Sequence, residues 1–322
     1  MTKPSTALAP DMRELNVSNA LLGDRDALNA AWQRDGYWFF RNVLDREVIA
    51  SIRGVYVKHL GRLGLVDVND PKAKYNGADL AALEGTVNAS ALNHAKVHKM
   101  LHEAPTINTF FNQLFGCPPF WVPFTVHRTT PPTRRRNESR FDFIHADGFY
   151  NEGLPFLICW VPLAQIDADV GGLALVEGVH NQPSLHKREG MQIKPIDPHD
   201  VPIGAWRRTT YQPGDVLLMS LDTPHSGITN HSDRFRLSMD TRVMPSSGDV
   251  PIVGRLAEVA ADHLRVEDAH GASTLVLDDK SFVRGLHGDQ MPRSEIPARF
   301  SAGDEVIIAV EQGRVVNMRP QH

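Results

Sequence analysis

Phe143-Ile144-His145-Ala146-Asp147-Gly148 is the stretch that decides the fold, because it places a histidine and an aspartate two residues apart. On an extended strand, side chains two residues apart point to the same face of the sheet. We therefore expect the imidazole of His145 and the carboxylate of Asp147 to project together into the interior that this strand lines. The pair has little specificity when it stands alone, because an ordinary hydrogen-bonded surface pair has the same pattern.

A third side chain of matching chemistry follows 80 residues later, in Asp222-Thr223-Pro224-His225-Ser226-Gly227. Two neutral imidazoles and one carboxylate on one face, with the opposite positions open, form the facial triad of non-haem Fe(II) sites. The sequence thus predicts a metal site made by His145, Asp147 and His225. By itself His225 would be read as a loop histidine, and it is the surrounding pattern that favours a ligand.

A second set of histidines, His94, His98 and His102, has helical spacing inside a helix that we predict over residues 89–102. Three positions at i, i+4 and i+8 span about 12 Å along a helix, which is too long to ligate one ion. We interpret this set as a packed or substrate-facing helix face and not as a metal site.

Composition excludes several classes of protein. The 322 residues are 42% hydrophobic and 22% charged, which is typical of a soluble globular protein with a substantial core. A net charge of -4 provides no basic field for nucleic acid or an anionic membrane. Two cysteines exclude a disulfide framework and favour a cytoplasmic location. No apolar stretch approaches the roughly 18 residues that span a bilayer.

Short strands separated by turn residues replace helices from Trp121 onward. This pattern of short strands and turns predicts an all-β core, an antiparallel sandwich or barrel, with helices packed around it. We expect a disordered leader over residues 1–20 and a single domain over residues 21–322, with a helical part (21–120), the β core (121–245) and a C-terminal extension (246–322). Helices are predicted over residues 24–33, 45–63, 89–102, 106–115 and 256–264. Strands are predicted over residues 37–40, 122–128, 140–146, 155–162, 173–177, 215–221 and 235–243, with a terminal hairpin over 306–310 and 315–318.

Residues 37–243 resemble the phytanoyl-CoA dioxygenase-like branch of the Fe(II)/2-oxoglutarate oxygenases. Four landmarks carry the resemblance, and they occur in the family's order. They are His145-Ala146-Asp147-Gly148; Trp160-Val161-Pro162-Leu163 leading through Gly171-Gly172 to Glu177-Gly178-Val179-His180; Pro213-Gly214-Asp215; and His225 running to Arg236-Leu237-Ser238. Glu177 and Val179 depart from the family's Pro-Gly-Ser-His. The resemblance implies a double-stranded β-helix, or jelly roll, with flanking α-helices.

The resemblance also implies Fe(II), 2-oxoglutarate and O₂ as reactants, with ascorbate stimulating turnover. The distal carboxylate of 2-oxoglutarate requires a fixed cation, and a guanidinium matches it in bidentate fashion. We favour Arg236, with Ser238 adding a hydroxyl from the same strand face, although Arg234 shares that parity. Thr125, His127 and Arg128, on the strand before the metal pair, are further candidates, and we expect one of them to contact the cosubstrate.

The expected reaction is oxidation, by default hydroxylation, of an unactivated C–H bond in a small molecule such as a secondary metabolite, with release of succinate and CO₂. Phe149 and Tyr150 closely follow the metal pair, and Arg135 and Arg136 lie in a basic loop before it, so all four are candidates for substrate contact.

Two other interpretations stay open, a jelly-roll metalloenzyme without 2-oxoglutarate, such as a cupin-like isomerase or hydrolase, and a non-catalytic binding protein. The C-terminal segment could mediate a homodimer.

Overall fold

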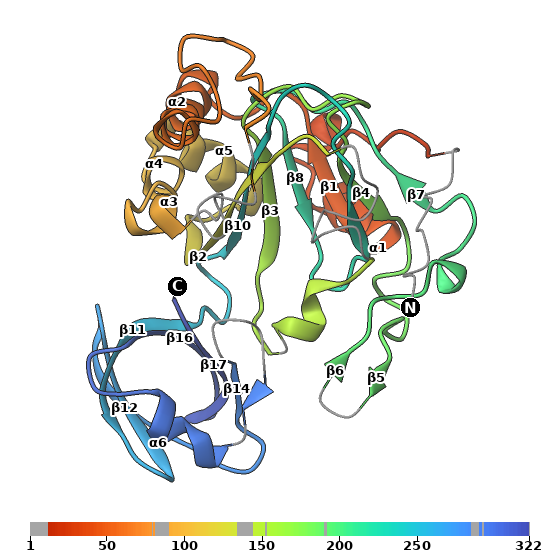
Figure 1. The fold of residues 1–322 in the computed structure, drawn as a ribbon. Helices are drawn as coiled ribbons and strands as arrows, with labels where there is room; N and C mark the ends of the chain where they lie inside the picture. Colours follow the sequence, from red (N-terminus) through yellow and green to blue (C-terminus); the bar gives the residue numbers. More distant parts are fainter. Residues whose placement is uncertain are drawn as a thin grey trace.

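A five-stranded antiparallel sheet forms one wall of the sandwich that dominates Figure 1. Its strands, in spatial order, are β1 (Tyr37–Phe40), β8 (Val216–Met219), β3 (Leu157–Pro162), β10 (Arg236–Pro245) and β2 (Pro119–Thr130). β10 lies between β3 and β2 and is buried along almost its whole length. The structure, a computed structural model, describes residues 12–78, 80, 90–133, 144–151, 153–189, 192–284, 290–291 and 293–321.

A smaller sheet faces this wall. It contains β7 (Trp206–Arg207), β4 (Gly172–Val176) and β9 (His225–Ile228), and residues 144–145 extend it by bridging to Ile196 and His225. An apolar layer that includes Leu175 of the small sheet and Leu217 of the large one lies between the two sheets. Two facing antiparallel sheets of this kind confirm the predicted jelly roll.

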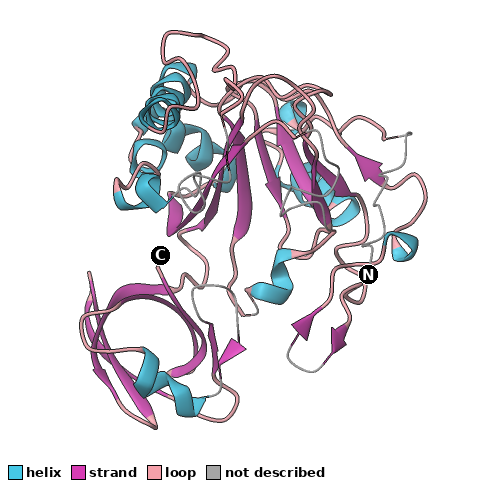
Figure 2. Cartoon of the chain, viewed as in Figure 1, coloured by secondary structure: helices cyan, strands magenta, loops and turns pink. Residues whose placement is uncertain are grey.

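Helices cover the outer face of the large sheet (Figure 2). They are α1 (Arg25–Asp35), α2 (Arg46–Arg62), α3 (Ser90–His94), α4 (Lys99–His102) and α5 (Pro105–Phe115). Asp24 and Asp45 cap α1 and α2 by accepting backbone N–H groups of the first turn, as such residues do at helix starts. Leu237 and Met239 of β10 point into the core under the helices, so Arg236 and Ser238 point to the other side, between the sheets.

A closed barrel follows the sandwich. Its sheet runs in the order β13 (Gly271–Val276), β12 (His263–Asp268), β11 (Ile252–Val259), β16 (Glu305–Glu311), β17 (Arg314–Pro320), β14 (Phe282–Arg284) and β15 (Gln290–Met291), and a β13–β17 pairing closes it. The barrel has its own apolar core, which Ile296 of α6 (Ile296–Arg299) joins. Its outer face packs on the sandwich through Ile307 and Ala309, which contact Leu154 and Phe156 in one apolar cluster.

The remaining short elements are η1 (Asn19–Leu21), η3 (Asp147–Tyr150), η4 (Pro198–Asp200), η5 (Arg293–Glu295) and the strand pair β5 (Arg188–Glu189) and β6 (Gln192–Ile193). No helix within the described residues is long and apolar enough to cross a membrane.

Two predicted helices are wrong. Residues 256–264 form part of the β11–β12 hairpin, in which residues 256–259 pair with 264–266. Residues 252–255, at the start of β11, pair with β16, and these pairings together override the helical propensity of the segment. The helix over residues 89–102 is interrupted: Lys96 has a φ of 50°, and α3 and α4 lie on either side of it. His98 is therefore buried while His94 is exposed, and the three histidines do not share one helix face. The terminal hairpin is confirmed as β16 and β17.

Candidate metal centre

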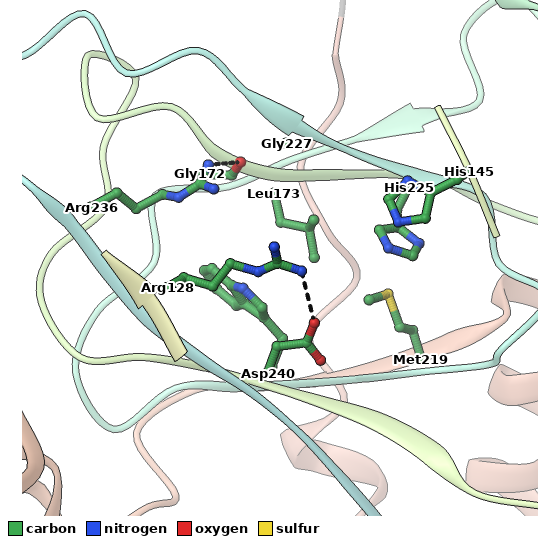
Figure 3. Close-up of a pocket in the computed structure, with 10 residues that line it drawn as sticks. Arg128, His145, Gly172, Leu173, Met219, His225, Gly227, Arg236 and Asp240 are labelled. Atoms are coloured by element: carbon green, nitrogen blue, oxygen red, sulfur yellow. Dashed lines mark hydrogen bonds and ion pairs between the residues drawn. The ribbon is translucent and has the colours of Figure 1, made fainter. Parts of the chain in front are cut away.

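His145 and His225 lie directly opposite each other on neighbouring antiparallel segments. The backbone N–H of His145 donates to the carbonyl of His225 at 3.0 Å, and the N–H of His225 donates to the carbonyl of His145 at 2.8 Å. Side chains of such a pair emerge on the same face of the sheet, and the two ring centroids are 4.3 Å apart (Figure 3). Both side chains therefore project into the space between the sheets.

Asp147 completes the group at the start of η3, two residues after the bridge at His145. Its Oδ1 lies 3.5 Å from Nε2 of His145, and one donor atom from each of the three residues lies within 4.8 Å of the others. Among the described residues, this is the group of His, Cys, Asp and Glu side chains with a geometry that could hold a metal ion. The predicted convergence of the three side chains is observed.

The hydrogen bonds and charges of this group suit a divalent cation. Nδ1 of His225 lies 3.0 Å from the carbonyl oxygen of Thr223, so Nδ1 is the donor of this hydrogen bond and Nε2 is the nitrogen available to a metal. Burial by itself raises the pKa of Asp147, but the charge of His225 and His145 when their rings are protonated, together with the guanidinium of Arg242, outweighs it and lowers the pKa below its usual value. Arg242 Nη2 lies 3.3 Å from Asp147 Oδ2. The carboxylate is therefore ionised, as a metal ligand requires.

A cavity between the two sheets connects this group with Arg236 (Figure 3). The guanidinium of Arg236 is buried, and its Nη1 donates to the carbonyls of Gly172 at 2.9 Å and Ile228 at 3.3 Å. Ser238 lies on the same face of β10, fully buried, and its Oγ has no hydrogen-bond partner among the described residues. A buried cation beside an unsatisfied hydroxyl is the chemistry that a carboxylate ligand would complete.

Glycine makes the approach of β4 to β9 possible. Gly171 has a φ of +83°, and a Cβ placed there would lie 2.3 Å from the backbone oxygen of Ile228. The turn therefore needs glycine, and it delivers the carbonyl of Gly172 to Arg236.

Strand parity places Thr125 and His127, two of the candidates for cosubstrate contact, on the face of β2 that points away from the cavity. Thr125 donates from Oγ1 to Oγ1 of Thr241 at 3.0 Å, and Nδ1 of His127 lies 2.5 Å from the hydroxyl of Tyr56 in α2. Both side chains thus face the helical layer, and their predicted contact with the cosubstrate is corrected. Arg234 pairs with Asp167 at 2.6 Å outside the cavity, so of the two candidate arginines Arg236 is the one that lines the cavity.

Two charged residues of the cavity region, Asp240 and Arg242, did not enter the predicted site, whereas Arg128 is one of the predicted candidates. Arg128 lines the cavity and pairs with Asp240 at 3.2 Å, and Asp240 also pairs with Arg242 at 3.1 Å. The sequence carried a signal for both: Asp240 and Arg242 continue the parity of Arg236 and Ser238 along β10. Phe149 and Tyr150 lie in η3, and their side chains are outside the described residues, as are Arg135 and Arg136.

The family model for phytanoyl-CoA dioxygenase (PhyH) matches residues 32–238, about two thirds of the chain and all of the metal group. The chain belongs to the phytanoyl-CoA dioxygenase family. This membership, together with the His–Asp–His group, confirms the predicted class, an Fe(II)/2-oxoglutarate-dependent oxygenase. The match ends inside β10, so the C-terminal barrel is not part of it.

Relatives of this phytanoyl-CoA dioxygenase family member include two proteins named 1-deoxypentalenic acid 11-beta-hydroxylase, from Streptomyces arenae and Streptomyces exfoliatus. They are 28% and 27% identical over 242 residues, which cover 70% of this chain and 83% of each relative. Similar solved structures include the epimerase SnoN with Fe³⁺, alpha ketoglutarate and nogalamycin RO, at 21% identity and a TM-score of 0.46, covering 69% of this chain and 84% of that one. EctD from S. alaskensis with 2-oxoglutarate and 5-hydroxyectoine has 19% identity and a TM-score of 0.44, covering 74% and 82%.

Proposed function

We propose that the protein hydroxylates an unactivated C–H bond of a small molecule and converts 2-oxoglutarate and O₂ to succinate and CO₂ in the same turnover. The observation that carries the proposal is the single cavity between the sheets, whose wall contains His145, His225 and Arg236 together. A metal at the histidine end and a carboxylate at the arginine end define the two ends of one chelating cosubstrate.

His145, Asp147 and His225 would hold Fe(II) through two neutral imidazoles and one ionised carboxylate. Bound iron supplies the redox chemistry that activates O₂, and the chain supplies binding, orientation and exclusion of water. Arg242 supports this arrangement from outside the ligand set, because its guanidinium contacts the Asp147 oxygen that lies away from His145.

Arg236 would bind the distal carboxylate of 2-oxoglutarate, with Ser238 donating from Oγ. The guanidinium is held by two backbone carbonyls and buried, so its donors are fixed before the ligand arrives. A charge-assisted bond to a preorganised guanidinium is stronger and more directional than one to a flexible lysine. Trp160, Leu173 and Met219 also line the cavity and provide an apolar wall that limits the access of water.

Hydroxylation of a small molecule of secondary metabolism is the reaction that we favour, because the two Streptomyces relatives described above are named as hydroxylases of a small carboxylic acid. We keep Arg135 and Arg136 as candidates for binding an acidic group of the substrate. Phe149 and Tyr150, in the turn after Asp147, are candidates for packing on its apolar part.

Succinate release during anaerobic and aerobic incubation with Fe(II), ascorbate and 2-oxoglutarate tests the proposal. We expect succinate only with O₂ present, none from His145→Ala, Asp147→Ala or His225→Ala, and a KM for 2-oxoglutarate raised by at least tenfold in Arg236→Ala. In a screen of small acids and polycyclic metabolites, the substrate should stimulate succinate release. Turnover of a substrate without O₂ and with Arg236→Ala fully active would instead indicate a jelly-roll enzyme that does not use 2-oxoglutarate.

A further inference from the structure

The C-terminal barrel reaches the metal group through one arginine. Arg319 of β17 donates from Nη1 to Oδ1 of Asn151 at 2.7 Å. Asn151 is buried and follows η3 directly. Its Nδ2 donates to the backbone carbonyl of Asp147 at 2.9 Å. Two consecutive hydrogen bonds therefore connect a strand of the barrel to the main chain of a metal-ligand residue.

A second connection runs through an aromatic ring and reaches the carboxylate of the same residue. The guanidinium carbon of Arg319 lies 3.6 Å from the ring centroid of Phe124 in β2. The guanidinium carbon of Arg242 lies 4.5 Å from the same centroid. Arg242 is the residue whose Nη2 lies 3.3 Å from Asp147 Oδ2. The quadrupole of the ring attracts both cations, so Phe124 fixes the position of each relative to the other.

Apolar packing between the barrel and the sandwich lies beside the Arg319–Asn151 contact. Ile307 and Ala309 of β16 belong to one buried cluster with Leu154 and Phe156, which follow Asn151 in the chain. A Cβ on Gly153 would lie 2.6 Å from Cγ1 of Val316 in β17, so the turn after Asn151 rests directly on the barrel. The contact between Arg319 and Asn151 therefore lies next to a packed interface between the barrel and the sandwich.

We infer that the C-terminal barrel is a working part of the metal centre and that Arg319 is a positioning residue for Asp147. The inference rests on the proposed function, because it concerns the same metal ligands. Asp147 leaves the strand and enters a short 3-10 turn, so the sheet alone does not fix its carboxylate. Asn151 anchors the main chain of that turn, and Arg242 orients the carboxylate. Arg319 contacts Asn151 directly and packs on the same Phe124 ring as Arg242. Partners that orient metal ligands in this way commonly contribute 10- to 100-fold to metal affinity.

Metal binding by the full chain tests the role of Arg319. Arg319→Gln, Asn151→Ala and the double variant would be titrated with Co²⁺ by calorimetry, with the unfolding temperature of each metal-free protein recorded in parallel. We expect each single variant to weaken Co²⁺ binding by about tenfold and the double variant to weaken it by less than the product, because both changes break the same connection.

Two control variants separate positioning from general loosening of the barrel. Arg265→Gln removes an exposed arginine from β12 of the same barrel and should bind Co²⁺ like the parent. Val316→Ala reduces apolar packing at the interface while leaving Arg319 and Asn151 in place, so it should lower the unfolding temperature and retain the affinity. Equal Co²⁺ affinity in Arg319→Gln and the parent would overturn the inference alone. A parent protein that binds no Co²⁺ would overturn the proposed metal site as well.

Discussion

Two histidines between the large sheet and the helices, His102 and His127, predict that the folded protein loses stability in mild acid. His102 stacks on Trp121 with ring centroids 4.5 Å apart and its Nε2 lies 2.8 Å from Thr241 Oγ1, while His127 contacts the hydroxyl of Tyr56. Burial lowers the pKa of His102 and of His127 from 6.5 to about 3, and the nearby His98 adds to the shift in both. These rings stay neutral in the folded protein while the unfolded chain takes up protons.

The sign and size follow from proton linkage. Because the folded pKa is depressed, unfolding takes up protons below pH 6.5, and stability falls from that pH down to about pH 3. At pH 5 a histidine with these two pKa values contributes a loss of about 2 kcal/mol relative to pH 7. Removing one such histidine should make the dependence of the unfolding free energy on pH shallower by about 1.4 kcal/mol per pH unit between pH 4 and 6.

Urea unfolding of metal-free protein at several pH values between 4 and 7 measures this slope, with EDTA present so that metal release does not contribute. His127→Gln keeps a polar group near Tyr56 and removes the titration, so its slope should be the shallower one. His94→Gln is the matched control, because His94 is exposed on α3 and should leave the slope unchanged. Identical slopes for His127→Gln and the parent would refute the reasoning.

Three further changes test separate parts of the structure. Gly171→Ala should lower the free energy of unfolding in urea by about 1–3 kcal/mol, because it strains a φ of +83° and places a Cβ against the backbone of Ile228. Gly204→Ala is the control: its φ is +76° but the space around it is open, so it should lower the free energy of unfolding by less. Arg234→Ala should leave the KM for 2-oxoglutarate unchanged, because Arg234 pairs with Asp167 outside the cavity; a rise like that of Arg236→Ala would show that the cosubstrate arginine is misassigned. Asp240→Asn should destabilise the protein by about 3 kcal/mol in urea unfolding, because it removes the buried carboxylate between half-buried Arg128 and buried Arg242, and a loss below 1 kcal/mol would contradict this ion-pair network.

The metal ligands could be predicted because their residue types, spacing and order are themselves the signal. His145 and His225 need only be opposite each other on two strands, and the flanking Pro213-Gly214-Asp215 and Arg236-Leu237-Ser238 restrict where those strands lie. The starts of α1 and α2 could also be predicted, because Asp24 and Asp45 accept hydrogen bonds from backbone N–H groups only a few residues away.

Features that depend on parity or on distant pairing were harder to predict. A shift of one residue along β2 separates His127, which faces the helices, from Arg128, which faces the cavity. Residues 256–264 contain good helix formers, but the segment forms a hairpin with β12, and the residues just before it, 252–255, pair with β16 about 50 residues later. The contact of Arg319 with Asn151 depends on how the barrel packs on the sandwich, which no local pattern of residues encodes.

Anaerobic titration of the Fe(II) protein with 2-oxoglutarate tests the central claim most directly, because chelation of ferrous iron by the 2-oxo acid produces a weak visible absorption band. The account predicts that the parent develops the band, that His225→Ala does not, and that Arg236→Ala develops it only at much higher 2-oxoglutarate concentration. An unchanged titration in Arg236→Ala, or a band that survives in His225→Ala, would contradict the assignment of this cavity as the site of iron and 2-oxoglutarate.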